Sequence, residues 1–296
     1  MINRRKFLNS TGKAIGSIAL LNIIPGVSTA INLPPQHTVQ QVIDIILKAG
    51  NLNPAAGTVD TIKAGNADQP VTGIVTTMFA TTDVINQAVK LGANFIIAHE
   101  PTFYNHTDDK DLVKDNPVVK EKLDLLNRHK ITVWRFHDGL HSLNPDPVGY
   151  GFLQKTGWLK YYKDEQYSIQ IPAVSLQQMV QHLKKSLGIQ HVRVIGDLNL
   201  QCRKVTVIPG AAGGKWQMSA VVADNPDVLI VGEVSEWETA EFIRDSNAQG
   251  RKKALIILGH ALSEEPGMEC LVSWLQPKLP GIKITHIASG EPFTWM

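Results

Sequence analysis

Short apolar runs alternate along this chain with segments of helical periodicity, and this alternation constrains the fold more than any other feature. The runs typical of strands cover residues 71–76, 95–98, 131–136, 192–195, 205–208, 228–231, 255–258 and 282–287. The helical segments cover residues 38–49, 82–91, 117–129, 175–187, 216–224, 236–248 and 267–275. Strands and helices in alternation predict an α/β protein with mixed, largely buried sheets that are flanked by helices.

The segment 142–172 breaks this pattern because it is rich in Pro, Gly and Tyr. We interpret it as a linker-like junction between two lobes, a first α/β lobe in residues 31–190 and a second in residues 191–296. Within the second lobe, Ser235 and Glu238 have the spacing of a capping box and predict the start of a helix.

The first thirty residues, 1–30, are typical of an export signal. Arg4 and Arg5 are followed by Lys6 and then by Phe-Leu, which closely resembles the twin-arginine consensus. The apolar run that follows is too short to span a membrane stably, and small residues end the segment where signal peptidase needs them. We predict cleavage after Ala30, export in the folded state to the periplasm and no membrane contact afterwards. An uncleaved N-terminal anchor is the alternative.

The charge of the remaining chain argues against one class of partner. Four of the 29 basic residues lie within the signal segment, which has no acid, so 25 basic and 27 acidic residues remain. No basic tract with interleaved aromatics is present, so we expect no nucleic-acid binding. Cys202 and Cys270 form no C-x-x-C pair, and they are interpreted either as one disulfide or as two buried thiols.

Histidines and carboxylates directly follow three of the predicted strands. The segments FIIAHEP, VWRFHDGLH and LIILGHALSE supply His99, Glu100, His137, His141, His260 and Glu264. Polar residues at the carboxyl ends of sheet strands lie in the crevice where α/β proteins place their sites. We therefore predict that the three strand ends build one shared centre.

The spacing within these segments suits metal ligation. His137 and His141 are four residues apart, as are the His and Glu of the third segment, so each pair shares one face of a helical turn. His99 and Glu100 are adjacent, and the chain must turn there for both to bind. Imidazole and carboxylate together suit Zn, Mn, Fe or Co, and six donors fit two divalent ions better than one tetrahedral ion.

Other residues carry weaker signals. Asp138 is interpreted as a partner that orients an imidazole, and Glu233 either as another such partner or as a surface residue. The glycine-rich PGAAGGK at 209–215 lacks the Ser or Thr of a phosphate-binding loop and predicts a tight strand-to-helix turn. The sequence has no G-x-S-x-G nucleophile elbow and no H-E-x-x-H zinc motif.

Three ordered motifs resemble those of the NIF-three-like dinuclear metal-centre family (NGG-one-interacting-factor-three-like). That family has a His-His-Pro motif at a strand end, then a His-Thr-Asn-Leu-Asp-type motif, and a Gly-His-x-x-x-Glu motif near the C-terminus. The counterparts here are HEP at 99–101, HDGLH at 137–141 and GHALSE at 259–264. The likeness covers residues 38–296.

Two positions depart from the family pattern. Glu100 stands where the family has its second histidine, and His141 stands where the family has the closing aspartate. The total of four imidazoles and two carboxylates is preserved, as retained charge balance at a metal centre would produce.

The resemblance implies a two-lobed α/β fold with the metals between the lobes, and a ring-shaped homohexamer. We expect a metal-dependent hydrolase in which metal-activated water attacks an unknown small-molecule substrate, with Glu100 or Glu264 bridging the ions or acting as the catalytic base. The alternatives are a metal-buffering protein without turnover and an oligomeric scaffold. Some family members have been called GTP cyclohydrolase-like. We consider this activity less plausible for an exported protein, because GTP is scarce outside the cytoplasm.

Overall fold

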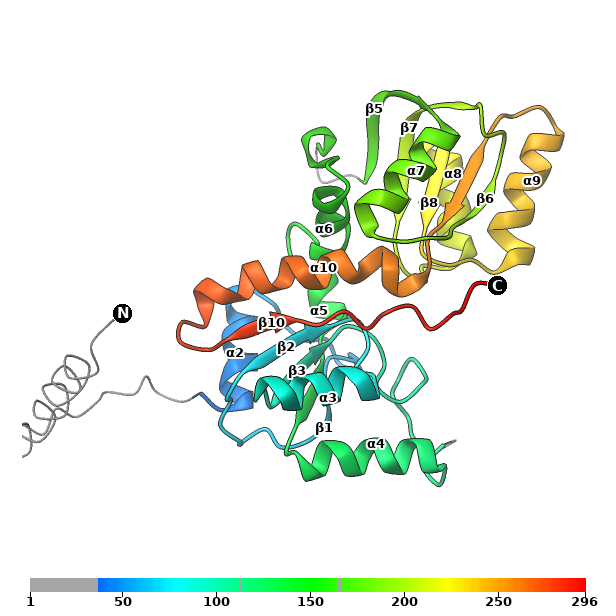
Figure 1. Cartoon of the computed structure of the whole chain (residues 1–296). Helices are drawn as coiled ribbons and strands as arrows, with labels where there is room; N and C mark the ends of the chain where they lie inside the picture. Colours follow the sequence, from blue (N-terminus) through cyan, green and yellow to red (C-terminus); the bar gives the residue numbers. More distant parts are fainter. Residues whose placement is uncertain (1–36, 112, 164–166) are drawn as a thin grey trace, which may run out of the picture. The chain divides into compact units, whose positions relative to one another are not determined.

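The computed structural model describes residues 37–111, 113–163 and 167–296. The predicted signal segment lies outside the described residues. The described residues belong to one unit of the fold, in which two five-stranded sheets are flanked by helices (Figure 1). The prediction of a mixed α/β fold is thereby confirmed.

The first sheet has the strand order β1-β4-β3-β2-β10. Its strands are β1 (Ile62–Ala64), β2 (Ile74–Thr77), β3 (Phe95–Ala98), β4 (Thr132–Arg135) and β10 (Ile284–His286). Strand β1 pairs antiparallel with β4, and the other four strands pair in parallel. The central strands β2, β3 and β4 are buried along their whole length, as expected for a sheet that is covered on both faces.

Four helices cover the two faces of the first sheet. They are α2 (Val39–Ala49), α3 (Thr82–Leu91), α4 (Pro117–Arg128) and α10 (His260–Leu275). Apolar residues of α2 and α10 pack against one face, and those of α3 and α4 pack against the other. Helix α2 starts at a capping box, in which Thr38 and Gln41 satisfy each other's backbone amides.

The second sheet has the strand order β5-β7-β8-β9-β6. Its strands are β5 (Ser168–Ser175), β6 (Arg193–Ile195), β7 (Gln201–Ile208), β8 (Val228–Val231) and β9 (Ala254–Ile257). The three central strands are parallel, and the edge strands β5 and β6 are antiparallel. The helices on its two faces are α6 (Pro147–Lys155) with α7 (Leu176–Leu187), and α8 (Gly214–Asp224) with α9 (Glu241–Ala248).

The predicted capping box at Ser235 and Glu238 is absent, although a helical turn does begin directly after Ser235. Ser235 makes no side-chain cap, and a π-helical turn, η2 (Glu236–Ala240), leads into α9. The amide of Glu238 donates instead to the main-chain carbonyl of Ser235. The glycine-rich turn after β7 does lead into a helix, α8, as predicted.

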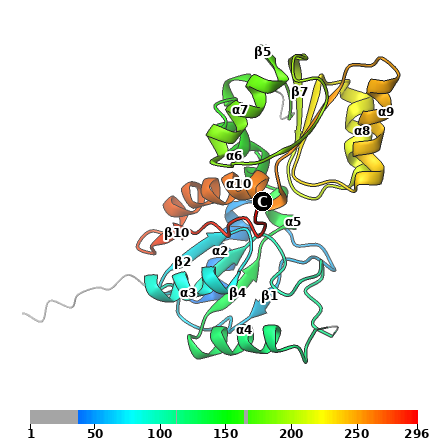
Figure 2. The ribbon, with the colours of Figure 1, turned by 45° about the vertical axis from the view of Figure 1, so that its right-hand side comes forward.

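The segment that we expected to be linker-like, 142–172, holds regular structure. It contains α6, the short 3-10 turn η1 (Leu159–Tyr161) and the start of β5. Asp146 caps α6 through the amide of Val148, with a proline at the first turn. Both views show helix α6 next to helix α10 (Figure 1 and Figure 2). The two helices cross at Gly151 and Gly267, where the absence of side chains lets the backbones approach closely.

The two sheets do not divide the chain at residue 190. Strand β5 precedes that position and belongs to the second sheet, whereas β10, near the C-terminus, belongs to the first. The chain therefore passes from the first sheet to the second and returns along α10, which ends in the 3-10 turn η3 (Gln276–Lys278).

Two further features of the described residues bear on the expectations from sequence. Cys202 and Cys270 are both free, so they form no disulfide in the structure. Among residues 37–111, 113–163 and 167–296, no helix combines the length and the hydrophobicity that crossing a membrane requires.

Candidate metal centre

Two candidate ligands follow β3 at the carboxyl edge of the first sheet. The amides of His99 and Glu100 continue the ladder with β2, donating to the carbonyls of Thr77 and Met78 at 3.1 and 2.9 Å. The imidazole of His99 is fully buried, and the carboxylate of Glu100 is nearly so. The paired backbone fixes where both side chains begin, so they enter the site from a rigid element.

The second pair of ligands lies on the one-turn helix α5 (Asp138–His141). Asp60 holds this turn, because its carboxylate accepts from the amides of His137, Asp138 and Gly139 at 2.7 to 2.9 Å. His137 and His141 therefore sit at the start and the end of a single turn, as their spacing predicts.

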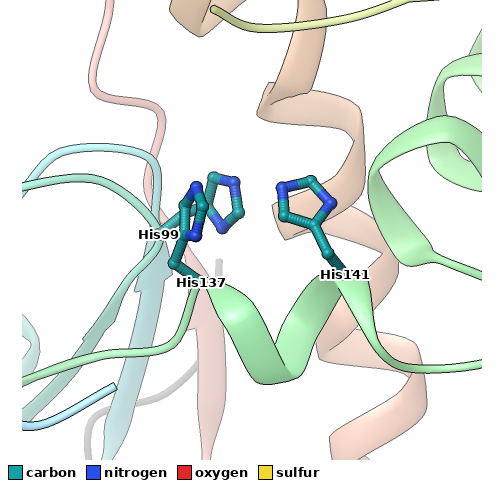
Figure 3. A group of neighbouring side chains, drawn as sticks. All are labelled: His99, His137 and His141. Carbon is teal, nitrogen blue, oxygen red and sulfur yellow. The ribbon is translucent and has the colours of Figure 1, made fainter. Parts of the chain in front are cut away.

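Two aspartates orient the imidazoles of this turn. Nδ1 of His137 lies 2.9 Å from Asp138, and Nδ1 of His141 lies 3.0 Å from Asp146. Because a carboxylate only accepts, each Nδ1 donates the proton of this contact, and in the neutral imidazole Nε2 then has a lone pair for a metal. The rings of His99, His137 and His141 face a common space (Figure 3), with ring centroids 4.7 to 5.0 Å apart.

The third pair comes from the first turn of α10. Nε2 of His260 lies 3.2 Å from Oε2 of Glu264 and 3.3 Å from Oε1 of Glu100. Gly210, in the turn after β7, makes room for this carboxylate, because a Cβ atom there would lie 2.1 Å from Oε1 of Glu264. The glycine at this turn thus leaves the space that the carboxylate of Glu264 occupies.

All six predicted residues therefore meet in one place. Nε2 of His99 lies 3.6 Å from Oε2 of Glu264, and Nε2 of His137 lies 3.7 Å from Oε1 of Glu100. Two triads have ligand atoms close enough to hold a metal ion: His99 with His137 and His141, and His99 with Glu100 and Glu264.

Two buried atoms face each other at 3.6 Å in the centre of this cluster. Nε2 of His99 has no hydrogen-bond partner among the described residues, and Oε2 of Glu264 has its ion-pair partner, His260, at 3.2 Å. Leaving such a nitrogen unsatisfied costs free energy, and most native structures avoid it. A cation between the two atoms would bind both, so the residues present fit a metal.

The pKa values of His99 and His141 are shifted in opposite directions. Burial holds the pKa of His99 well below its usual value, and the neighbouring His141 and His137 lower it further. His99 is therefore a neutral imidazole. Burial also opposes the charged form of His141, but the hydrogen bond and the charge of Asp146 raise its pKa above the usual value.

The imidazole of His260 contacts the carboxylates of both Glu100 and Glu264. Burial alone would lower its pKa, but Glu100 and Glu264 raise the pKa of His260 to about 10. Burial likewise favours the neutral form of Glu100, yet His260, His137 and Arg135 hold the pKa of this carboxyl below its usual value. Without a metal, the site is held together by this mutual charge neutralisation.

Five residues around the ligands complete the site. Asp138 orients His137, as its position in the sequence suggested. Asp60 gave no local signal, because its partners become neighbours only in the fold. Asp146 lies five residues after His141 and directly before the proline that starts α6, so its signal was that of a helix cap. Arg135 did give one, since it is a lone charge in an apolar strand. Glu233 is half exposed and lies 3.8 Å from Nδ1 of His260.

The cluster opens onto two cavities. One, of about 800 Å³, is lined by Glu100 and His260 together with Phe79, Tyr104 and Lys122. The other, of about 740 Å³, is also lined by Phe79 and His260 and extends along the C-terminal residues 291–295. Both cavities are large enough for a small molecule that reaches the ligand cluster.

Comparison with known proteins places the chain in a family. A family model described as Duf34/NIF3 (NGG1p interacting factor 3) matches residues 38–292. A Clostridium perfringens protein named GTP cyclohydrolase 1 type 2 homolog is 22% identical over 214 residues, which cover 69% of this chain and 78% of that protein.

Solved structures agree on the fold. A Staphylococcus aureus hypothetical protein aligns with a TM-score of 0.69 at 18% identity, over 88% of this chain and 99% of that chain. A Bacillus cereus protein related to NIF3 aligns with a TM-score of 0.67 at 14% identity, over the same shares of the two chains. With the family model spanning nearly all of the described residues, this chain belongs to the Duf34/NIF3 family.

Proposed function

We propose that this chain is an exported metal-dependent hydrolase with two divalent ions, of the Zn, Mn, Fe or Co type, at the six-residue cluster. The observation that carries the proposal is the buried Nε2 of His99, which has no hydrogen-bond partner among the described residues and faces Oε2 of Glu264 at 3.6 Å. His99 belongs to both candidate triads, and Glu264 belongs to one of them. When bound, such ions lower the pKa of a bound water and stabilise the developing charge of an oxyanion.

The protein's own residues divide the remaining work. Glu100 lines the larger cavity and its carboxyl pKa is held below the usual value, so the carboxylate can act there either as a metal ligand or as the acceptor of a proton from a reacting group. Glu264 is buried against Gly210 and faces both His99 and His260, which suits a carboxylate that bridges two ions. The cavities supply the open side that separates a hydrolase from a closed structural or buffering site.

Metal content tests the site first. We expect elemental analysis of the purified chain to give about two divalent ions per protomer, and His260→Ala or Glu264→Ala to lose most of them. The matched control is Glu269→Ala on the same helix, where the carboxylate pairs with Lys155 on the surface. Full metal content in the His260 and Glu264 variants would place the site elsewhere.

Turnover tests the activity. The metal-loaded chain should hydrolyse at least one member of a panel that covers phosphoesters, amides and ring carbons, and Glu100→Gln should slow it by about 10²–10⁴-fold, as expected for the loss of a general base. GTP belongs in that panel, because a relative carries the name GTP cyclohydrolase 1 type 2 homolog. A metal-loaded chain that turns over nothing would favour metal buffering.

We also propose export and assembly, each on sequence grounds. The Arg4-Arg5 signal supports delivery of the folded protein to the periplasm through the twin-arginine route, with cleavage after Ala30. Membership of the family supports a homohexamer, and light scattering that found only monomers at micromolar concentration would refute it.

A further inference from the structure

Arg135, the last residue of β4, is a cation inside the protein. Its side chain is fully buried, in a strand whose other residues are Thr132, Val133 and Trp134. A buried charge is costly unless other groups compensate it. The groups around the guanidinium therefore show what this residue does.

The guanidinium of Arg135 contacts the segment 99–108, which follows β3 and begins with two of the candidate ligands. Nε donates to the carbonyl of His99 at 3.1 Å, and Nη2 lies 3.3 Å from Oε2 of Glu100. Nη1 donates to the carbonyl of His106 and lies 3.5 Å from Asp108. Arg135 thus spans residues 99–108 from one end to the other.

Asp108 is fully engaged elsewhere as well. Its carboxylate accepts from the amides of Thr102 and Phe103 at 2.6 and 2.9 Å, and it lies 3.3 Å from Nζ of Lys63. Asp108 is therefore shared among several donors. Glu100 remains as the second carboxylate beside Arg135, and it is the only one of the two that also belongs to the ligand cluster.

The two carboxylate oxygens of Glu100 have different contacts. Oε2 faces Arg135, whereas Oε1 lies 3.3 Å from His260 and 3.7 Å from His137. Oε1 is thus the oxygen in the contacts with the ligand histidines of α5 and α10. The contact with Arg135 occupies part of the acceptor capacity of Oε2, so Glu100 is disposed to offer Oε1 to an ion rather than both oxygens.

We propose that Arg135 is a positioning residue that reserves one oxygen of Glu100, and that this restriction biases the centre toward ions of low coordination number. The inference rests on the proposed metal centre. Zn²⁺ is satisfied by four ligands, whereas Mn²⁺ prefers more oxygen donors in an octahedral arrangement. Freeing Oε2 would add an oxygen donor and favour Mn²⁺ relative to Zn²⁺.

The test is a double-variant cycle in the full-length chain. Zn²⁺ and Mn²⁺ dissociation constants are measured by competition with a chromophoric chelator for the wild type, Arg135→Met, Glu100→Gln and the double variant. We expect Arg135→Met to shift the Zn²⁺/Mn²⁺ preference toward Mn²⁺ by about tenfold, because residues that share a site are coupled. In the Glu100→Gln background, the same substitution should shift it by less than about twofold, within the range of independent sites.

If Arg135→Met does not fold, a conservative variant takes its place in the test. Arg135→Lys retains the charge but not the planar fork that holds Oε2, so it should shift the preference in the same direction. An unchanged preference in either folded variant, or an equal shift without Glu100, would overturn the positioning role while leaving the metal centre intact. A wild-type chain that binds neither ion would remove the proposed centre and this role together.

Discussion

The proton on His260 links the charge of the site to metal binding. The pKa of His260 in the fold, about 10, is higher than its ordinary value of 6.5, so its pairing with Glu100 and Glu264 stabilises the metal-free protein fully below pH 6.5. This contribution is lost as the pH rises through about 10. Because an imidazole binds metal only when it is neutral, an ion must displace this proton.

Metal affinity should therefore rise with pH. Between pH 6.5 and 8.5 we expect the Zn²⁺ affinity to increase about tenfold per pH unit for each proton displaced, with His260 supplying one of them. Competition titrations at several pH values measure the slope. His260→Ala should bind more weakly and with a slope smaller by about one proton, so an unaltered slope in that variant would contradict the assignment.

The candidate ligands could be predicted from the sequence more readily than the residues that hold them in place. His99, His137 and His260 each follow an apolar strand, and parallel strands bring such positions to one sheet edge. The third of these strands lies in the second sheet, and α10 returns its ligands to the first. Asp60 could not be found in this way, because it lies 77 residues before the amide that it holds.

At the scale of elements, the crossing of α6 and α10 determines where the third ligand pair lies. Gly151 of α6 packs directly on α10, and a Cβ atom there would lie 2.4 Å from the carbonyl oxygen of Pro266. The reverse approach is equally close, since a Cβ atom on Gly267 would lie 2.7 Å from Cα of Val148. Backbone on both sides leaves little room for relaxation.

Gly151→Ala should consequently destabilise the protein by about 1–3 kcal/mol, the usual cost of overpacking a close contact. It should also reduce metal content, because α10 carries His260 and Glu264 on its first turn. Thermal unfolding and elemental analysis measure the two effects. Gln154→Ala, at an exposed position on α6, is the control and should leave both unchanged. A stable, metal-replete Gly151→Ala would show that the helices can separate freely.

The elements themselves were predictable where periodicity was strong and poorly predictable where small residues dominate. The runs 95–98 and 228–231 coincide with β3 and β8. In α6, by contrast, Pro147, Gly149 and Gly151 resemble a loop in composition. In the fold, Gly151 packs closely on α10 and Gly149 packs on Tyr167, so these contacts depend on segments that lie elsewhere in the chain.

For the whole molecule, the ligand set connects distant parts of the chain. The ligands extend from residue 99 to residue 264, so bound ions would act as cross-links that only the folded chain can accept. Removing the ions with a chelator should therefore lower the Tm by about 5 °C or more, since an ion at 100 times its Kd contributes about 2.7 kcal/mol. The His260→Ala variant should show a much smaller difference, and an equal Tm with and without chelator would argue against a native ion.

Export can be tested independently of the metal. Replacing Arg4 and Arg5 by lysine should retain the protein in the cytoplasm, because the twin-arginine pair is the address that the route reads. Cell fractionation measures the distribution. Lys6→Ala, which leaves the pair intact, is the control, and undiminished export of the Arg4/Arg5 variant would exclude this route.

The place of β10 in the first sheet has a consequence for biosynthesis. Thr76 and His286 are neighbours on adjacent strands although 210 residues separate them in sequence. As the nascent chain emerges from the ribosome, β2 keeps an open edge, and such an edge is a template for wrong pairing. The first sheet can therefore take its final form only after β10 has been synthesised, 210 residues after the strand that it pairs with. Until then, the exposed edge of β2 has to be kept from pairing with other strands.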